Sequence, residues 1–182
     1  RGCFPQFDKF IEQTKDVWTH LVDIRKSFEP RAEELAKKYA LAPYTMFIGS
    51  GALWGETILF SMCILEEMQW KRTRYITSAD FFHGTLELVE PGVPVFLFMG
   101  EDENRKLDER VRAFLNRGVT GDTDINIIDT AEFAIPGLDD EFRVIVSPWI
   151  LSSLITDRLA AYYETVTKHN LNYRRYYHQF DY

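Results

Sequence analysis

The stretch VPVFLFM, Val93–Met99, decides the fold of this chain. It is a short, uninterrupted apolar run with a glycine on each side, Gly92 and Gly100. A run of this length and composition predicts a β-strand that is buried on both faces. Such strands are typical of parallel sheets with helices packed on either side, which places the chain in the α/β class.

The segments around Val93–Met99 alternate between strand and helix patterns. Parallel strands need a crossover connection, usually a helix, between one strand and the next. Further strands are predicted at Thr45–Ile48, Arg74–Ser78, Asp124–Asp129 and Phe142–Ser147. Helices are predicted from Ala52 to about Trp70, over Glu103–Gly118, and from Ser147 to about His169. We therefore expect a three-layer αβα sandwich with a five-stranded parallel sheet of the flavodoxin-like type.

Two helices are predicted ahead of the sheet. Apolar residues from Gln6 to Lys26 recur close to helical spacing, and Glu29-Pro30-Arg31 begins a second helix that ends near Tyr39. We expect residues 1–42 to form a linker and packing helices, and residues 43–182 to form one domain with a C-terminal tail. Because the chain begins at Arg1 rather than at methionine, we also expect it to be part of a longer polypeptide.

Composition argues against several classes of function. The 182 residues carry a formal net charge of −7, whereas nucleic-acid binding requires a basic surface, so we expect no nucleic-acid partner. Cys3 and Cys63 have no metal-binding spacing and indicate no disulfide framework, which favours a cytoplasmic protein without a metal site. We recognise no signal peptide and no apolar run long enough to cross a bilayer, and so expect no membrane partner.

Ligands of parallel α/β sheets gather at the carboxyl ends of the strands. Three features are predicted there: the turn Gly49-Ser50-Gly51, the loop that contains His83, and Gly100-Glu101-Asp102. The first, within GSGALWG, loosely fits a dinucleotide-binding motif, but Trp54 and the displaced last glycine do not suit close approach of a pyrophosphate. Glycine at a strand-to-helix turn also has a purely backbone explanation.

His83, in the stretch SADFFHGTLELVEPG, is a candidate for chemistry because histidine is the side chain best suited to proton transfer near neutral pH. A lone loop histidine is more often a polar surface group. Glu66 and Glu67 are further candidates, since carboxylates are unfavourable at the C-terminal end of a helix. A solvated helix end is the ordinary alternative. Consecutive α-helical residues point about 100° apart, so we expect at most one of the two to face a site.

The C-terminal tail NLNYRRYYHQFDY is rich in tyrosine and arginine. Arg174 and Arg175 are candidates for pairing with a phosphate or a carboxylate of a substrate, with Tyr176 beside them. A tail that docks on the domain through its aromatic rings explains the composition equally well. The tail is therefore a candidate substrate-binding segment with a structural alternative.

The order of these features resembles the sugar isomerase (SIS) domain family over essentially the whole chain. A strand ends in Gly-x-Gly, a long helix ends in glutamate, and His83 of a His-Gly pair follows Glu67 by sixteen positions. The segment EMQWKRTRYITSADFFHG is similar to the catalytic segment in the isomerase half of glucosamine-6-phosphate synthase. The resemblance implies that Glu67 is the catalytic base, that His83 opens the sugar ring, and that no metal or other cofactor is needed. It also implies a homodimer, because this histidine reaches the neighbouring subunit's site in related isomerases.

Within this family, the chain looks most like the C-terminal SIS domain of the deglycases that act on 6-phosphorylated Amadori compounds. The tail ending in RRYYHQFDY is similar to theirs. The 6-phosphofructose-aspartate (fructose-asparagine pathway) deglycase is the first choice, and the fructoselysine 6-phosphate enzyme is the second. Such enzymes carry two SIS domains, and the first supplies a Ser/Thr loop for the sugar phosphate that is absent here. Thr85 stands where the family usually has a proline after the His-Gly pair.

The implied reaction converts the phosphorylated Amadori compound and water to glucose 6-phosphate and a free amino acid. His83 opens the ring, Glu67 removes a proton from C1 to give an enaminol, and protonation at C2 gives an aldimine that water hydrolyses. One alternative is a phosphosugar aldose–ketose isomerase that uses the same two residues. Another is a non-catalytic SIS module that senses sugar phosphates.

Overall fold

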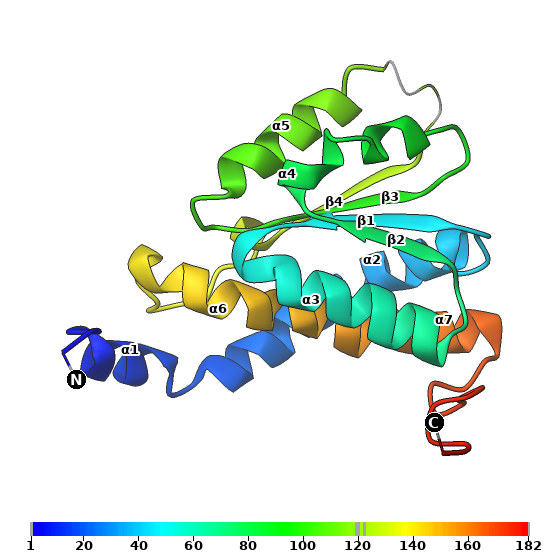
Figure 1. The fold of residues 1–182 in the computed structure, drawn as a ribbon. Coiled ribbons are helices and arrows are strands. Elements are labelled where there is room, and N and C mark those ends of the chain that lie inside the picture. The colour runs from blue at the N-terminus through cyan, green and yellow to red at the C-terminus, as the bar shows by residue number, and fades with distance from the viewer. Residues whose placement is uncertain (1, 119–120, 122, 182) are drawn as a thin grey trace.

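The fold is built around a parallel sheet of four strands. The computed structural model describes residues 2–118, 121 and 123–181. The strands are β1 (Thr45–Gly49), β2 (Thr73–Ile76), β3 (Val95–Met99) and β4 (Ile125–Asp129), and all neighbouring pairs run parallel. Their order across the sheet is β2-β1-β3-β4, so the strand predicted from VPVFLFM lies in the interior (Figure 1). The expected parallel α/β architecture is confirmed.

The two central strands, β1 and β3, are buried along their whole length. Alternate side chains of a strand point to opposite faces. Phe47 and Phe96 enter one apolar cluster, and Met46 and Leu97 enter the other. Because both faces of the sheet are apolar, each must be covered by helices, which gives the three layers that the sequence predicts.

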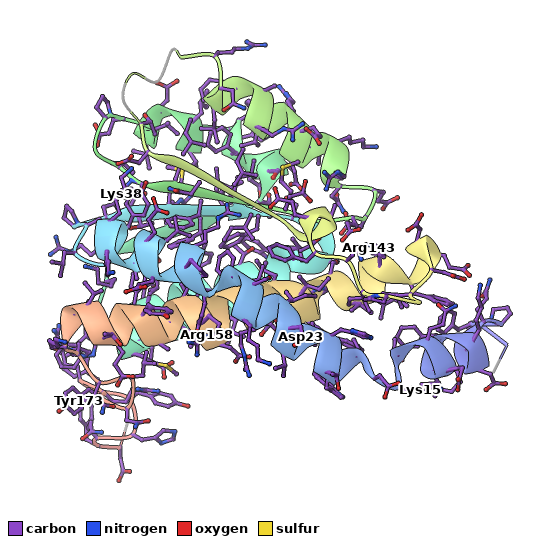
Figure 2. All side chains as sticks on the ribbon, turned by 180° about the vertical axis from the view of Figure 1, so that it is seen from behind. Lys15, Asp23, Lys38, Arg143, Arg158 and Tyr173 are labelled. Carbon is purple, nitrogen blue, oxygen red and sulfur yellow. The ribbon has the colours of Figure 1, made fainter. Side chains whose placement is uncertain are left out.

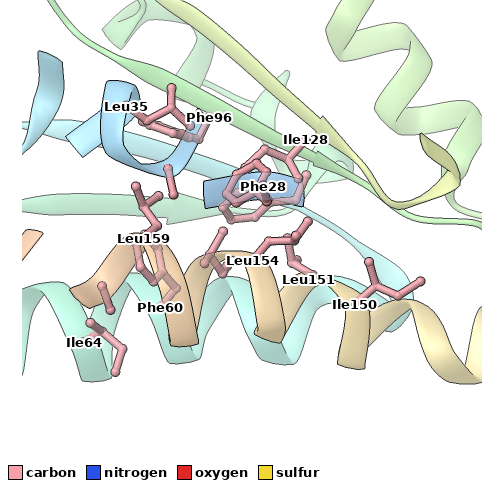
Figure 3. Packing of buried hydrophobic residues seen from close by; sticks show 14 of the residues in the cluster. Phe28, Leu35, Phe60, Ile64, Phe96, Ile128, Ile150, Leu151, Leu154 and Leu159 are labelled. Atoms are coloured by element: carbon pink, nitrogen blue, oxygen red, sulfur yellow. The ribbon is translucent and has the colours of Figure 1, made fainter. Parts of the chain in front are cut away.

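Most of the helices pack on one face of the sheet. It is covered by α2 (Val17–Tyr39), α3 (Trp54–Ile58), the π-helical segment η2 (Leu59–Met68), and the continuous run of α6 (Asp140–Ser152), η5 (Ser153–Leu159) and α7 (Ala160–Thr167). Figure 3 shows Phe28 of α2, Phe60 of η2 and Leu154 of η5 packing together beneath Phe96. This larger cluster is the principal core of the molecule.

The opposite face is covered by fewer and shorter elements. They are α4 (Ser78–Phe81), the 3₁₀ turn η3 (Thr85–Leu88) and α5 (Arg105–Leu115). Phe81 of α4 and Val111 of α5 are fully buried against the sheet. The remaining elements are α1 (Phe7–Thr14), η1 (Gly51–Leu53) and η4 (Thr130–Glu132).

The expected fifth strand is wrong. Phe142–Ser147 lies inside α6, so the last helix begins at Asp140 rather than at Ser147. The β-branched residues of FRVIVS suggested a strand, yet the buried residues Phe142, Val146, Ile150 and Leu154 recur every four positions and form a helical stripe. Because this stripe continues into η5, burial against the sheet favours one long helix.

Pro148 does not end this helix, although it cannot donate a backbone hydrogen bond. The carbonyl that it leaves free is that of Val144, four residues earlier. The Ser147 hydroxyl donates to this oxygen over 3.2 Å. The residue beside the proline therefore replaces the missing hydrogen bond, and the helix passes through.

The N-terminal helix boundaries also differ from the expected ones. The predicted helix over residues 6–26 is divided between α1 and α2, whereas α2 continues through Pro30 to Tyr39. Buried Phe28 and Ala32 flank Pro30, so packing against the core holds α2 together there. By contrast, α1 turns away to place Phe10 against Phe142 of α6, at 5.4 Å between ring centroids.

The run Asp140–Thr167 is the one helix within the described residues that is long and apolar enough to cross a membrane, judged by length and composition. Half of its most apolar window is buried inside the protein, and it carries Arg143 and Arg158, which pair with Glu101 and Glu29. These are properties of a core helix. The sequence-based view missed its length because part of it was assigned to a strand.

Candidate functional site

The glycine turn after β1 contains a carboxylate of the protein itself. Asp102 Oδ2 accepts a hydrogen bond from the Ala52 backbone N–H over 2.5 Å. Gly51 has a φ of +54°, and a Cβ built on it would lie 2.1 Å from the same Asp102 oxygen. Glycine is therefore required so that the turn can close around Asp102. Since a carboxylate already binds where a pyrophosphate would, the turn argues against the dinucleotide interpretation.

A second carboxylate lies at the carboxyl ends of the strands. It belongs to Asp108 of α5, and a hydrogen-bond network through it links the residues that follow three of the strands. It accepts hydrogen bonds from the Ser78 hydroxyl over 2.5 Å and from the Gly100 N–H over 3.4 Å. The Ser50 hydroxyl accepts from the Ser78 N–H over 2.7 Å. Asp108 is only 1% exposed, and burial raises its pKa from 3.8 to about 6. Asp108 therefore has a structural role, because its hydrogen bonds hold together the loops at the carboxyl ends of the strands.

The raised pKa of Asp108 predicts a pH-dependent stability. Because the folded state binds the proton more tightly than the unfolded chain, this carboxyl contributes stability below about pH 4 that is lost as the pH rises to about 6. The loss amounts to about 3 kcal/mol. We expect the difference in unfolding free energy between the wild type and Asp108→Asn, measured by urea denaturation, to fall by that order between pH 4 and pH 7.

The control for this measurement is Asp23→Asn, because Asp23 is 67% exposed and pairs with Lys26 three residues away. Its difference from the wild type is expected to stay within about 0.5 kcal/mol at every pH. If the unfolding free-energy difference between the wild type and Asp108→Asn is also independent of pH, the carboxyl of Asp108 is not a buried, proton-binding group.

Glu67 lies at the opposite end of the sheet, beside the amino ends of the strands. It is near the end of η2, which leads directly into β2, and the neighbouring Glu66 accepts a hydrogen bond from the hydroxyl of Thr73, the first residue of β2, over 2.5 Å. Glu66 and Glu67 both line a cavity of about 440 Å³. This volume is within the usual range for small-molecule sites, so the cavity is large enough for a phosphorylated sugar derivative.

The expectation that at most one of Glu66 and Glu67 faces a given site is wrong. It assumed an α-helix, whereas η2 is π-helical, and the Gln69 N–H donates to the Ile64 carbonyl five residues earlier over 3.1 Å. The wider π turn reduces the angle between successive side chains, and such turns are frequent at functional sites. As a result, two adjacent carboxylates reach one cavity.

The tail forms the opposite wall of the cavity. Arg174 Nε donates to Glu67 Oε1 over 2.7 Å, and Arg174 Nη1 donates to the carbonyls of Leu171 and Tyr173 over 2.7 and 2.9 Å. The backbone of the tail thus fixes the guanidinium of Arg174 in the position from which it contacts Glu67. A charge-assisted pair of this kind fixes one carboxylate oxygen and leaves the other without a partner among the described residues.

Arg175 and Tyr176 also line the cavity. The guanidinium of Arg175 lies 4.4 Å from the ring centroid of Trp70. The tail is anchored by Gln69, whose amide donates to the His169 carbonyl over 2.6 Å. The two sequence-based interpretations of the tail are therefore compatible, because it docks on the domain and places its arginines beside Glu67.

His83 is not part of this cavity. It is exposed in the turn after α4, and its N–H donates to the Asp80 carbonyl over 2.9 Å. Phe81 and Phe82 pack against Phe114 of α5 rather than enclosing the histidine ring. Helix α4 and segment η2 cover opposite faces of the sheet, so a single chain does not bring His83 and Glu67 together (Figure 1).

Four lining residues were missed by the sequence analysis. One is Tyr177 of the tail, and the other three are Trp70, Lys71 and Arg72. These three directly follow EEMQ, and the signal that could have found them is the pair of cations beside two carboxylates. Figure 2 shows Tyr173 of the tail and Arg143 of the carboxyl edge at opposite ends of the helical layer. Glu67 thus lies away from the carboxyl ends of the strands, where the sequence analysis placed three other features. No group of three or more His, Cys, Asp or Glu side chains in the described ranges is placed to hold a metal ion.

The fold is shared with solved structures of proteins described as phosphosugar isomerases. No protein-family model matches the chain. It superimposes with a TM-score of 0.88 on the crystal structure of a Bacillus subtilis protein assigned as a phosphosugar isomerase, at 26% identity, over 97% of this chain and 53% of that one. The resemblance to SIS phosphosugar proteins is confirmed.

The sequence is similar to particular enzymes of that fold. It is 28% identical to a fructosamine deglycase of Bacillus subtilis (strain 168), over 94% of this chain and 51% of the relative. It is 29% identical to a fructoselysine 6-phosphate deglycase of Escherichia coli (strain K12), over 92% of this chain and 46% of the relative. The chain spans about half the length of the curated relatives it matches.

Proposed function

We propose that this chain is part of a deglycase that converts a 6-phosphorylated Amadori compound and water to glucose 6-phosphate and a free amino acid. The observation that carries the proposal is Glu67, fixed by Arg174 over 2.7 Å in a cavity of about 440 Å³, in a chain similar to two deglycases. Among such compounds, 6-phosphofructose-aspartate is the proposed substrate. The cytoplasm, where thiols such as Cys3 and Cys63 stay reduced, is the proposed location.

In the proposed reaction, the unpaired oxygen of Glu67 removes a proton from C1 of the open-chain ketosamine. Arg174 holds the other oxygen, so the carboxylate stays oriented during the transfer. The C2 oxygen takes up a proton from the substrate's ammonium group, which gives the enaminol. Glu67 returns the C1 proton to C2, and the enaminol becomes an aldimine. Water adds to the aldimine carbon, the carbon–nitrogen bond breaks, and glucose 6-phosphate and the amine leave. No electrons are exchanged with an external acceptor in this sequence.

Ring opening is assigned to His83 of a second copy of the chain. The location of the His83 turn and of Glu67 on opposite faces of the sheet supports this assignment. We propose a homodimer in which each site combines Glu67 of one protomer with His83 of the other. Isologous dimers create two such sites at once.

Mixing two inactive variants tests the shared site. Glu67→Gln and His83→Asn, each in the complete polypeptide, are expected to be inactive as homodimers. Their heterodimer keeps one intact site, so equal mixing should restore about a quarter of the wild-type activity. Absence of any restored activity in verified heterodimers would contradict the shared site.

The chain is also proposed to be the second of two SIS domains. Support comes from its span of about half the length of its relatives and from apolar residues exposed on α1 and α2, such as Phe7, Ile11 and Trp18. Trp18 is 67% exposed and stacks on Trp149, with ring centroids 5.7 Å apart. A surface of this kind is suited to contact with another domain.

A phosphosugar aldose–ketose isomerase is the second candidate, because the structural neighbour is described as a phosphosugar isomerase. The deglycase and isomerase functions are distinguished by incubating the complete polypeptide with three substrates. These are 6-phosphofructose-aspartate, 6-phosphofructose-lysine and fructose 6-phosphate. Glucose 6-phosphate is followed with a coupled dehydrogenase. Release from an Amadori compound supports the deglycase, and conversion of fructose 6-phosphate alone supports the isomerase. Binding of sugar phosphate without turnover would instead support a sensing module.

A further inference from the structure

The cavity beside Glu67 contains more positive than negative charge. Glu67 is paired with Arg174, and Glu66 accepts a hydrogen bond from Thr73. The side chains of Lys71 and Arg72 have no hydrogen-bond or ion-pair partner among the residues that the structure describes. Two cations on the cavity wall are therefore available to an anionic group.

Lys71 differs from three lysines that form ion pairs on the surface. Lys9, Lys15 and Lys38 each pair with a carboxylate, and each has a pKa raised by that pairing. Lys71 is half-buried, and desolvation lowers its pKa. A partly desolvated ammonium group without a partner is unfavourable, and an anion placed beside it relieves that cost.

The backbone holds these cations in place. Trp70 has a φ of +53°, which is uncommon for a bulky residue and must be supported by its surroundings. The His169 ring lies 4.3 Å from the Trp70 ring, and the Lys71 N–H donates to the Leu65 carbonyl over 2.8 Å. The chain thus leaves η2 through a fixed turn that places Lys71 and Arg72 on the same cavity as Glu67.

We propose that Lys71 and Arg72 bind a carboxylate of the amino-acid part of the substrate and so select its leaving group. This inference rests on the proposed deglycase function. In an Amadori compound the amine nitrogen is attached to C1, the carbon that Glu67 deprotonates, and an α-amino acid carries its carboxylate one carbon beyond that nitrogen. The phosphate is at C6, at the opposite end of the sugar. We therefore assign the cations that share a cavity with Glu67 to the carboxylate rather than to the phosphate.

Kinetics of the double variant Lys71→Gln/Arg72→Gln in the complete polypeptide test this assignment. One substrate is 6-phosphofructose-aspartate, and the other is the 6-phosphorylated Amadori compound of methylamine, which has no carboxylate. We expect kcat/KM for the aspartate compound to fall about 10- to 100-fold, mainly through KM, because charge-assisted hydrogen bonds are lost. The methylamine compound should change less than about threefold.

Two further variants separate binding from folding. Lys71→Arg/Arg72→Lys keeps both charges and should recover most of the loss, whereas Lys37→Gln, an exposed lysine of α2 that pairs with Glu33, should leave both substrates unaffected. An equal loss on both substrates would overturn the proposal, because it would place the cations on the phosphate or in the packing.

Failure of the deglycase function can be told from failure of this inference. If the wild type releases glucose 6-phosphate from neither compound, the shift of Tm by succinate and by inorganic phosphate is measured instead. A shift by succinate in the wild type that disappears in the double variant supports a carboxylate site. A shift by phosphate alone, or equal shifts in both proteins, overturns it.

Discussion

Glu67→Gln in the complete polypeptide is expected to lower kcat for glucose 6-phosphate release by about 10²- to 10⁴-fold, the usual contribution of a general base. Glutamine cannot accept the C1 proton, yet its amide oxygen can still accept the hydrogen bond from Arg174 Nε. The tail should therefore remain docked, and the Tm should change little. The measurement is a coupled dehydrogenase assay combined with thermal unfolding of the same preparation.

Glu66→Gln is the matched control, because Glu66 is adjacent in η2 and lines the same cavity. Its Oε1 is engaged by the Thr73 hydroxyl, and the proposed base is Glu67, which the resemblance to SIS isomerases matches to their catalytic glutamate. We expect less than about a tenfold loss for this variant. If Glu66→Gln is inactive while Glu67→Gln retains activity, the roles of the two carboxylates are reversed.

The apolar strands were the predictable part of the fold. Val93–Met99 and Thr45–Ile48 are uninterrupted apolar runs, and both became central strands because such residues need cover on two faces. FRVIVS carries the same residue types, but its apolar positions belong to a longer four-residue repeat that extends to Leu154. Local composition indicated a strand there, and packing over the whole helix overrode it.

The candidate site was predictable only in part. Glu66 and Glu67 were both found because carboxylates are unfavourable at the C-terminal end of a helix, and the family resemblance then selected Glu67. The cavity, in contrast, is formed when Arg174 meets Glu67 across 107 positions of sequence. Lys71 and Trp70 acquire their roles only from that contact, and the π turn that exposes both glutamates has no recognised local pattern in LFSMCILEEM. Long-range packing therefore defines most of the site.

Arg143→Met is expected to destabilise the protein by about 3–5 kcal/mol, the usual cost of removing one partner of a buried ion pair. Arg143 and Glu101 are 12% and 14% exposed, and Arg143 Nη2 donates to Glu101 Oε1 over 2.8 Å. The same nitrogen donates to the carbonyls of Thr130 and Phe133 over 3.0 and 3.1 Å. Methionine fills similar space but leaves Glu101 with the Thr130 hydroxyl as its one donor among the described residues. Urea denaturation at neutral pH measures the loss.

Two further variants serve as controls for the Arg143→Met measurement. Arg25→Met removes an exposed pair with Asp157, in which the side chains are 38% and 50% exposed, and should cost less than about 1 kcal/mol. Adding Glu101→Gln to Arg143→Met removes the uncompensated charge and should recover part of the lost stability. A cost for Arg143→Met as small as that for Arg25→Met would mean that water reaches Glu101. The pair would then not be what ties α6 to the end of β3.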